Sequence, residues 1–124
     1  MATGTIITES LRVGATLAGF ELTVSEIERL APADISPQQR QAGIPAHWTL
    51  LHFELPDSLA DRLASALAND LERGWYVDFH TATETYVVFA SRIFRYRSED
   101  RTGRAEVEAY ARTLSIPESQ LDWP

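Results

Sequence analysis

The 124-residue chain contains no cysteine and no lysine. Without cysteine it has no disulfide framework, thiol nucleophile, zinc ribbon or iron–sulfur cluster. Without lysine it has neither a Schiff-base amine nor the lysine of a phosphate-binding P-loop. All 11 basic residues are therefore arginine. This usage is typical of a high-GC coding sequence and does not by itself indicate a site that needs guanidinium groups.

Long apolar runs and net positive charge are also missing. The longest uninterrupted apolar run covers the five residues 86–90, whereas a membrane-spanning helix needs about 20. The N-terminus shows no basic region followed by an apolar stretch, so we expect no secretory signal, no membrane partner and a cytoplasmic location. The net charge of −7 argues against a nucleic-acid partner. Residues 91–104 are locally basic, which suits an acidic patch on a protein partner or second copy.

The weakly patterned parts of the chain lie in its first half. The length suits a single domain over residues 1–124, in which residues 1–20 form a weakly ordered N-terminal segment. Residues 31–47 form a long connection with three prolines. Within it, Ser36 followed by Pro37 and by a glutamine at the third position is typical of a helix start. A connection of this length is expected to cover a sheet edge or a pocket mouth, and edge cover is favoured.

Residues 20–30 allow two interpretations. Apolar residues alternate at Phe20, Leu22 and Val24, which indicates a strand. Ser25 followed by Glu28 also fits the capping box of a short helix. The strand is favoured, and the helix stays open.

The second half of the chain has clearer patterns. Leucine recurs every four residues over 59–71, which predicts a helix with one apolar face. Runs rich in β-branched and aromatic residues predict strands. The expected strands are 48–55, 75–80, 84–89 and 92–97, preceded by one or two N-terminal strands, and the expected helices are 57–73 and 104–114. This order predicts an α+β fold with an antiparallel sheet of about four to five strands and two main helices packed on one face.

The hairpin registers decide which side chains share a face of the sheet. A two-residue turn at 90–91 pairs Glu84 with Arg97. A three-residue loop at 81–83 pairs His80 with Glu84, and it is favoured because it gathers the apolar side chains of the three strands on one face. The opposite face then carries Tyr76, Asp78, His80, Glu84, Tyr86, Arg95 and Arg97, and strand 48–55 adds Trp48, Leu50, His52 and Glu54 if it joins the sheet.

This polar face supports two functional hypotheses. We expect a non-enzymatic binding or interaction protein, acting as a homodimer or with a protein partner, because interfaces favour tyrosine, tryptophan and arginine. Its ligand-binding residues would be Trp48, His52, Tyr76, Tyr86, Arg95 and Arg97. The alternative is a small enzyme or a binder of an anionic small molecule, with His80 as acid or base and Asp78 or Glu84 orienting it. Arg95 and Arg97 would then clamp the anion.

Other chemistries have weaker sequence support. His52, Asp78, His80 and Glu84 offer nitrogen and oxygen ligands, but no His-Glu-x-x-His motif or acidic calcium loop accompanies them. There is no Gly-x-Ser-x-Gly motif and no glycine-rich phosphate loop. We therefore predict neither a metal nor a cofactor.

Overall fold

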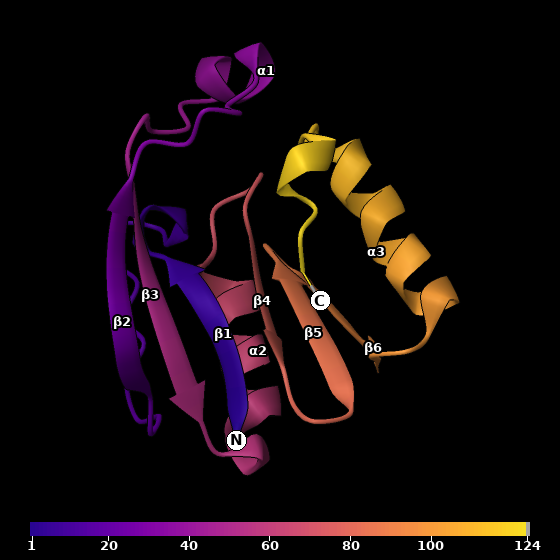
Figure 1. The fold of residues 1–124 in the computed structure, drawn as a ribbon. Coiled ribbons are helices and arrows are strands. Elements are labelled where there is room, and N and C mark those ends of the chain that lie inside the picture. Colours follow the sequence, from indigo (N-terminus) through magenta and orange to yellow (C-terminus); the bar gives the residue numbers. More distant parts are fainter. Residues whose placement is uncertain (124) are drawn as a thin grey trace.

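The computed structural model describes residues 1–123 of the chain, so the predicted domain range of 1–124 ends outside the described residues. Its centre is a six-stranded antiparallel sheet with strand order β2-β3-β1-β4-β5-β6 (Figure 1). The strands are β1 (Ala2–Ile7), β2 (Thr23–Leu30), β3 (Trp48–Leu55), β4 (Tyr76–His80), β5 (Glu84–Phe89) and β6 (Arg92–Arg97). The helices are α1 (Pro37–Gln41), α2 (Ala60–Asp70) and α3 (Arg101–Thr113), with 3-10 turns η1 (Thr8–Ser10), η2 (Asp57–Leu59) and η3 (Glu118–Gln120). The predicted α+β class is confirmed, with six strands in place of four to five.

The two long helices lie against opposite faces of the sheet. Val88 of β5 packs in one apolar cluster with α2, whereas its neighbour Val87 packs in a second cluster with α3. Adjacent side chains of a strand point to opposite faces. We name these the α2 face and the α3 face (Figure 1). This arrangement differs from the prediction that both helices pack on one face. None of the described helices is both long enough and apolar enough to cross a membrane.

The N-terminal strand β1 lies in the middle of the sheet. It pairs with β3 from Ala2 to Ile7 and with β4 at Thr3–Thr5. Its residues Ala2 and Ile6 are 0% and 3% exposed. The sequence predicts weak order over residues 1–20, yet residues 2–7 form a central strand. Local periodicity does not report the central position of this strand, because β1 is fixed by partners some 50 and 75 residues away in the chain.

Two predictions for the first half of the chain are confirmed. Residues 23–30 form strand β2, which lies at one edge of the sheet. The connection after it contains α1, which begins with a reciprocal capping box. The Ser36 hydroxyl accepts a hydrogen bond from the Gln39 backbone N–H, and the Gln39 side chain accepts one from the Ser36 N–H.

Helix α3 begins three residues before the predicted start at Arg104. The Asp100 carboxylate accepts hydrogen bonds from the backbone N–H groups of Thr102 and Gly103, at 3.0 and 3.1 Å. These bonds satisfy two donors at the helix start, so the helix begins at Arg101. The polar residues 98–103 show no apolar periodicity from which this earlier start could be predicted.

The register of β4 on β5 differs by one residue from the prediction. His80 pairs with Thr85 and Asp78 with Val87, so the predicted three-residue loop is wrong. The predicted turn between β5 and β6 is confirmed, with Phe89 opposite Arg92. Consequently Tyr76, Asp78 and His80 point to the α3 face, whereas Glu84, Tyr86, Arg95 and Arg97 point to the α2 face.

The burial of β5 explains this error. All its residues from Thr85 to Phe89 are buried, because α2 covers one face and α3 the other. A strand buried on both faces shows no apolar alternation, and such alternation was the only criterion that favoured the three-residue loop.

Gly4 sets the spacing between β1 and β4. A Cβ atom at this position would lie 2.5 Å from the Asp78 carbonyl oxygen and 2.5 Å from the Phe79 Cβ. Neither atom can move without shifting the backbone of β4. We expect Gly4→Ala to lower the free energy of unfolding by about 1–3 kcal/mol in urea denaturation. The control is Thr23→Ala on the exposed edge strand, with an expected change within about 0.5 kcal/mol. A Gly4→Ala protein as stable as the control would contradict the close approach.

Candidate functional site

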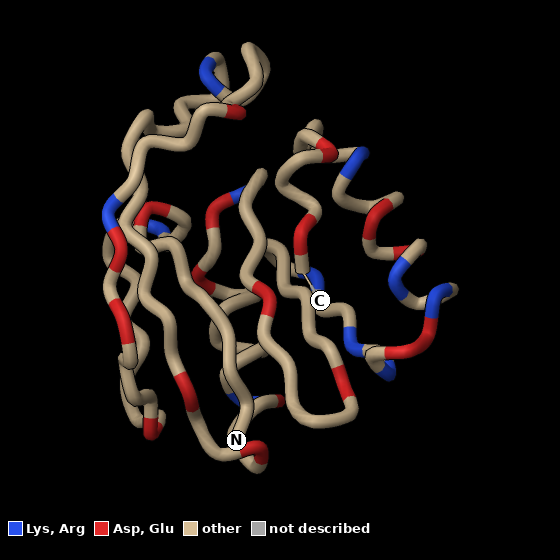
Figure 2. The backbone as a smooth tube through the Cα atoms, viewed as in Figure 1, with Lys and Arg blue, Asp and Glu red and all other residues tan. Residues whose placement is uncertain are grey.

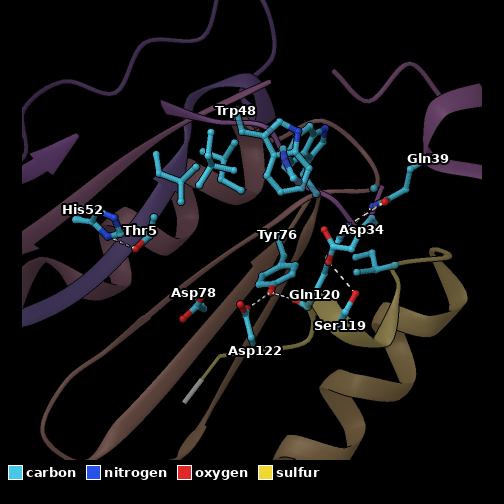
Figure 3. A pocket seen from close by; sticks show the side chains of 17 residues that line it. Thr5, Asp34, Gln39, Trp48, His52, Tyr76, Asp78, Ser119, Gln120 and Asp122 are labelled. Atoms are coloured by element: carbon cyan, nitrogen blue, oxygen red, sulfur yellow. Dashed lines mark hydrogen bonds between the residues drawn. The ribbon is translucent and has the colours of Figure 1, made fainter. Parts of the chain in front are cut away.

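The α3 face is hollowed into a pocket of about 500 Å³ where β3, β1 and β4 are not covered by α3 (Figure 3). These strands form its floor, the connection 31–47 forms one wall, and the C-terminal segment 116–122 forms the other. The apolar lining residues are Ile7, Leu30, Pro32, Trp48, Leu50, Trp75, Tyr76 and Ile116. The polar ones are Thr5, Asp34, Gln39, His52, Asp78, Ser119, Gln120 and Asp122.

About half of the predicted site residues meet at this pocket. Trp48 and His52 reach it from β3, and Tyr76 and Asp78 reach it from β4. His80 lines a shallower depression next to it, which shares His52 and Asp78 with the pocket. The predicted placement of strand 48–55, with Trp48 and His52 on the same face as Tyr76, is confirmed.

The other predicted residues form a separate cluster on the α2 face. Arg95 Nε lies 2.6 Å from the Glu84 carboxylate, and its Nη1 donates to Asp61 Oδ1 of α2 at 3.0 Å. Hydrogen bonding from Arg95 lowers the pKa of Glu84. Arg97 Nε donates to Glu99 at 3.0 Å. Both arginines therefore have carboxylate partners of their own and lie across the sheet from His80, so the expected combination of imidazole and anion clamp does not form.

Asp78 is the most perturbed carboxylate of the pocket. Burial raises the pKa of Asp78 to about 6, and the negative charge of Asp122 acts in the same direction. Its own backbone N–H and the more distant Arg104 act in the opposite direction. At neutral pH the pocket thus holds a largely buried, ionised carboxylate close to a second one. Carboxylates kept in such surroundings cluster at functional sites.

Tyr76 connects the floor of the pocket to its C-terminal wall. Its hydroxyl contacts the Gln120 carbonyl and lies 3.0 Å from Asp122 Oδ1 (Figure 3). Burial, together with the charges of Asp122 and Asp78, raises the pKa of Tyr76 above its usual value. The hydroxyl therefore stays protonated and acts as a donor to this wall.

Hydrogen bonds between side chains fasten the two walls to each other, and none of these side chains was among the predicted site residues. Gln39 Nε2 donates to Gln120 Oε1 at 2.9 Å, and Ser119 Oγ donates to Asp34 Oδ2 at 2.7 Å. The connection 31–47 thus lines the pocket, which is the less favoured of the two roles given to it above. The capping box at Ser36 was the one local signal that this stretch is ordered.

His52 stands at the rim of the pocket beside two glutamates of β2. Its Nδ1 lies 2.8 Å from Thr5 Oγ1, and its Nε2 contacts Glu28 and lies 3.5 Å from Glu26. The potential ligand atoms of this trio lie within 4.8 Å of one another, so nitrogen and oxygen donors for a metal ion are present here. The same contacts form ion pairs whenever His52 is protonated. The set of metal ligands weighed from the sequence is not assembled, because Glu84 lies on the opposite face.

Asp78→Asn is expected to stabilise the protein at neutral pH. The folded pKa of about 6 lies above the ordinary aspartate value of 3.8, so the folded state binds the proton more tightly than the unfolded state. The charged carboxylate of the wild type therefore costs stability above pH 6, and this cost disappears as the pH falls toward 4. We expect the variant to be more stable by about 2–3 kcal/mol at pH 7.5 and nearly equal at pH 4.

Urea denaturation at the two pH values measures this difference. The exposed residue Glu106 of α3 provides a charge-matched control, because Glu106→Gln also removes one carboxylate. A gain at pH 7.5 that is no larger for Asp78→Asn than for Glu106→Gln would contradict the burial of an ionised Asp78.

Searches with the chain against models of protein families, curated proteins and solved structures gave no match, so the geometry of the site carries the functional argument.

Proposed function

We propose that the protein is a non-enzymatic binding protein that takes a small, partly aromatic organic molecule into the pocket on the α3 face. The observation that carries this proposal is the pocket itself. Its volume of about 500 Å³ falls within the range of roughly 300–1,000 Å³ that small-molecule sites occupy. Its lining combines apolar and aromatic side chains with an equal number of polar ones. In such sites the apolar side chains bury the ligand and the polar ones orient it.

Contacts within the protein hold the aromatic side chains of the pocket in place. The ring centroids of Trp48 and Trp75 lie 5.1 Å apart at an interplanar angle of 59°. Trp48 Nε1 donates to the Pro45 carbonyl at 2.9 Å, and Tyr76 is tied to the C-terminal segment as described above. Because these rings are already ordered, binding a flat molecule against them costs little conformational entropy.

An enzymatic function has less support. His80 Nε2 lies 3.2 Å from Thr3 Oγ1, and of the predicted partners of His80 only Asp78 shares its face. The arginines proposed to hold an anion are on the other face. Non-enzymatic binding is therefore favoured over acid–base chemistry at His80.

Self-association is a second proposed function, and exposed apolar residues of β2 favour it. Val24 and Ile27 are 46% and 66% exposed, and they lie on an edge strand whose outer side has no partner in the sheet. Glu26 and Glu28 lie between and beside them and oppose direct pairing of two β2 strands. If the protein dimerises through this strand, Ile27→Glu shifts it to the monomer in sedimentation equilibrium. A dimer unaffected by this substitution would exclude β2 as the interface.

Indole tests the proposed pocket directly. In a titration followed by ¹H–¹⁵N NMR, we expect it to shift the side-chain N–H signals of Trp48 and Trp75 and the backbone signals of Tyr76. Trp48→Ala removes one aromatic ring from the pocket lining. It is expected to weaken indole binding at least about tenfold, which is the loss expected for one well-packed aromatic contact. Ile93→Ala, on β6 at the other edge of the sheet, is the control and leaves binding unchanged. No shifts at the pocket, or an affinity for indole that is unchanged in Trp48→Ala, would overturn the proposal.

A further inference from the structure

We propose that the ligand of this pocket is an organic amine, whose ammonium group binds between Asp78 and Asp122 while its apolar body lies against Trp48 and Tyr76. This inference rests on the proposed function and specifies the chemical class of the ligand. Its charge is opposite to that of the anionic small molecule in the alternative hypothesis from the sequence.

The charge of the pocket supports a cation. Three carboxylates line it, from Asp34, Asp78 and Asp122, and no arginine is among its described lining residues. Figure 2 shows several basic residues along α3 and β6 and others on β2, on α1 and around α2. Among the described lining residues, His52 is the only group that can become positive, and it lies at the rim in contact with Glu28. A concave site lined by one sign of charge concentrates ligands of the opposite sign.

Two of the three carboxylates have free hydrogen-bonding capacity toward the pocket. Asp34 Oδ2 accepts the hydrogen bond from Ser119 and helps to hold the walls together. Asp122 interacts with Tyr76 through Oδ1, which leaves Oδ2. Burial, nearby charges and its own backbone N–H act on Asp78, and no side chain within residues 1–123 donates a hydrogen bond to its carboxylate. An ammonium group carries three N–H donors and no acceptor, which suits two carboxylates with open lone pairs.

Arg104 does not fill this role. It is the cation that lowers the pKa of Asp78, but its guanidinium donates to the Trp123 carbonyl at 2.5 Å and stacks over the Trp123 ring at 5.1 Å. These contacts hold the Arg104 guanidinium group against Trp123 of the C-terminal segment. The repulsion between Asp78 and Asp122 therefore stays largely uncompensated until a cation enters the pocket.

The aromatic side chains of the pocket favour an organic cation over a bare metal ion. The Trp48 ring and the Tyr76 ring line the same cavity as Asp78 and Asp122 (Figure 3). Aromatic faces attract organic ammonium groups and at the same time bury apolar surface. A divalent metal ion would bind the carboxylates but would make no use of the apolar surface of the two aromatic rings.

Three probes that share one ring system test the inference. Tryptamine, indole and indole-3-acetate present a cationic, a neutral and an anionic substituent on the same indole ring. At pH 7.5 we expect the wild-type protein to bind tryptamine at least tenfold more tightly than indole, and indole-3-acetate more weakly than indole. Isothermal titration calorimetry gives the affinities, and NMR shifts at Trp48 and Tyr76 show that binding is in the pocket.

Substitutions of the two carboxylates complete the test. Asp78→Asn and Asp122→Asn are each expected to weaken tryptamine binding at least tenfold and to weaken indole binding by a clearly smaller factor. Glu106→Gln, which removes an exposed carboxylate from α3, changes neither. Thermal unfolding confirms that each variant is folded, and the two Asn variants are independent, so failure of one to fold leaves the other.

The outcomes separate the two proposals. If indole binds in the pocket but tryptamine binds no more tightly, or if neither Asn substitution weakens tryptamine, the amine inference is overturned and the binding function stands. If none of the three probes binds in the pocket, the proposed function itself fails.

Discussion

The pairing of His80 with Thr85 decides on which face of the sheet every side chain of β4 lies. In this register Val77 and Phe79, which are 1% and 0% exposed, pack into the apolar cluster against α2. Asp78 is then directed to the α3 face. A shift of one residue would exchange these faces and place the Asp78 carboxylate in the apolar cluster, where it would have to be desolvated without a partner. The core thus holds the register, and the register supplies the pocket with its central carboxylate.

The pocket depends equally on contacts that close over the sheet from distant parts of the chain. Gln39 meets Gln120 across 81 residues of sequence, and the same two segments are joined by Asp34 and Ser119. Beneath them β1 lies between β3 and β4 and brings Thr5 beside His52. The cavity is therefore a product of tertiary structure. It contains Asp78, a carboxylate that stays ionised at a cost in stability, and the proposed binding function would explain why this cost is accepted.

Local patterns predicted those parts of the molecule whose physical cause is local. The capping box at Ser36 predicted α1, and the residue types of 48–55 predicted a strand that places Trp48 and His52 on the face of Tyr76. The predictions failed where burial or pairing is set at long range. β5 is apolar on both faces, so it could not reveal its register, and β1 carries too short a pattern to show that it is central. As a result only part of the predicted site comes together, namely Trp48, His52, Tyr76 and Asp78. Arg95 and Glu84 pair with each other on the opposite face of the sheet.

Cross-strand nuclear Overhauser effects between β4 and β5 test the register most directly. The account predicts backbone contacts between Phe79 and Tyr86 and between Val77 and Val88. Contacts of Asp78 with Tyr86 and of His80 with Glu84 in their place would contradict it, because Asp78 would then face α2 and the pocket would lose the group on which its proposed ligand depends.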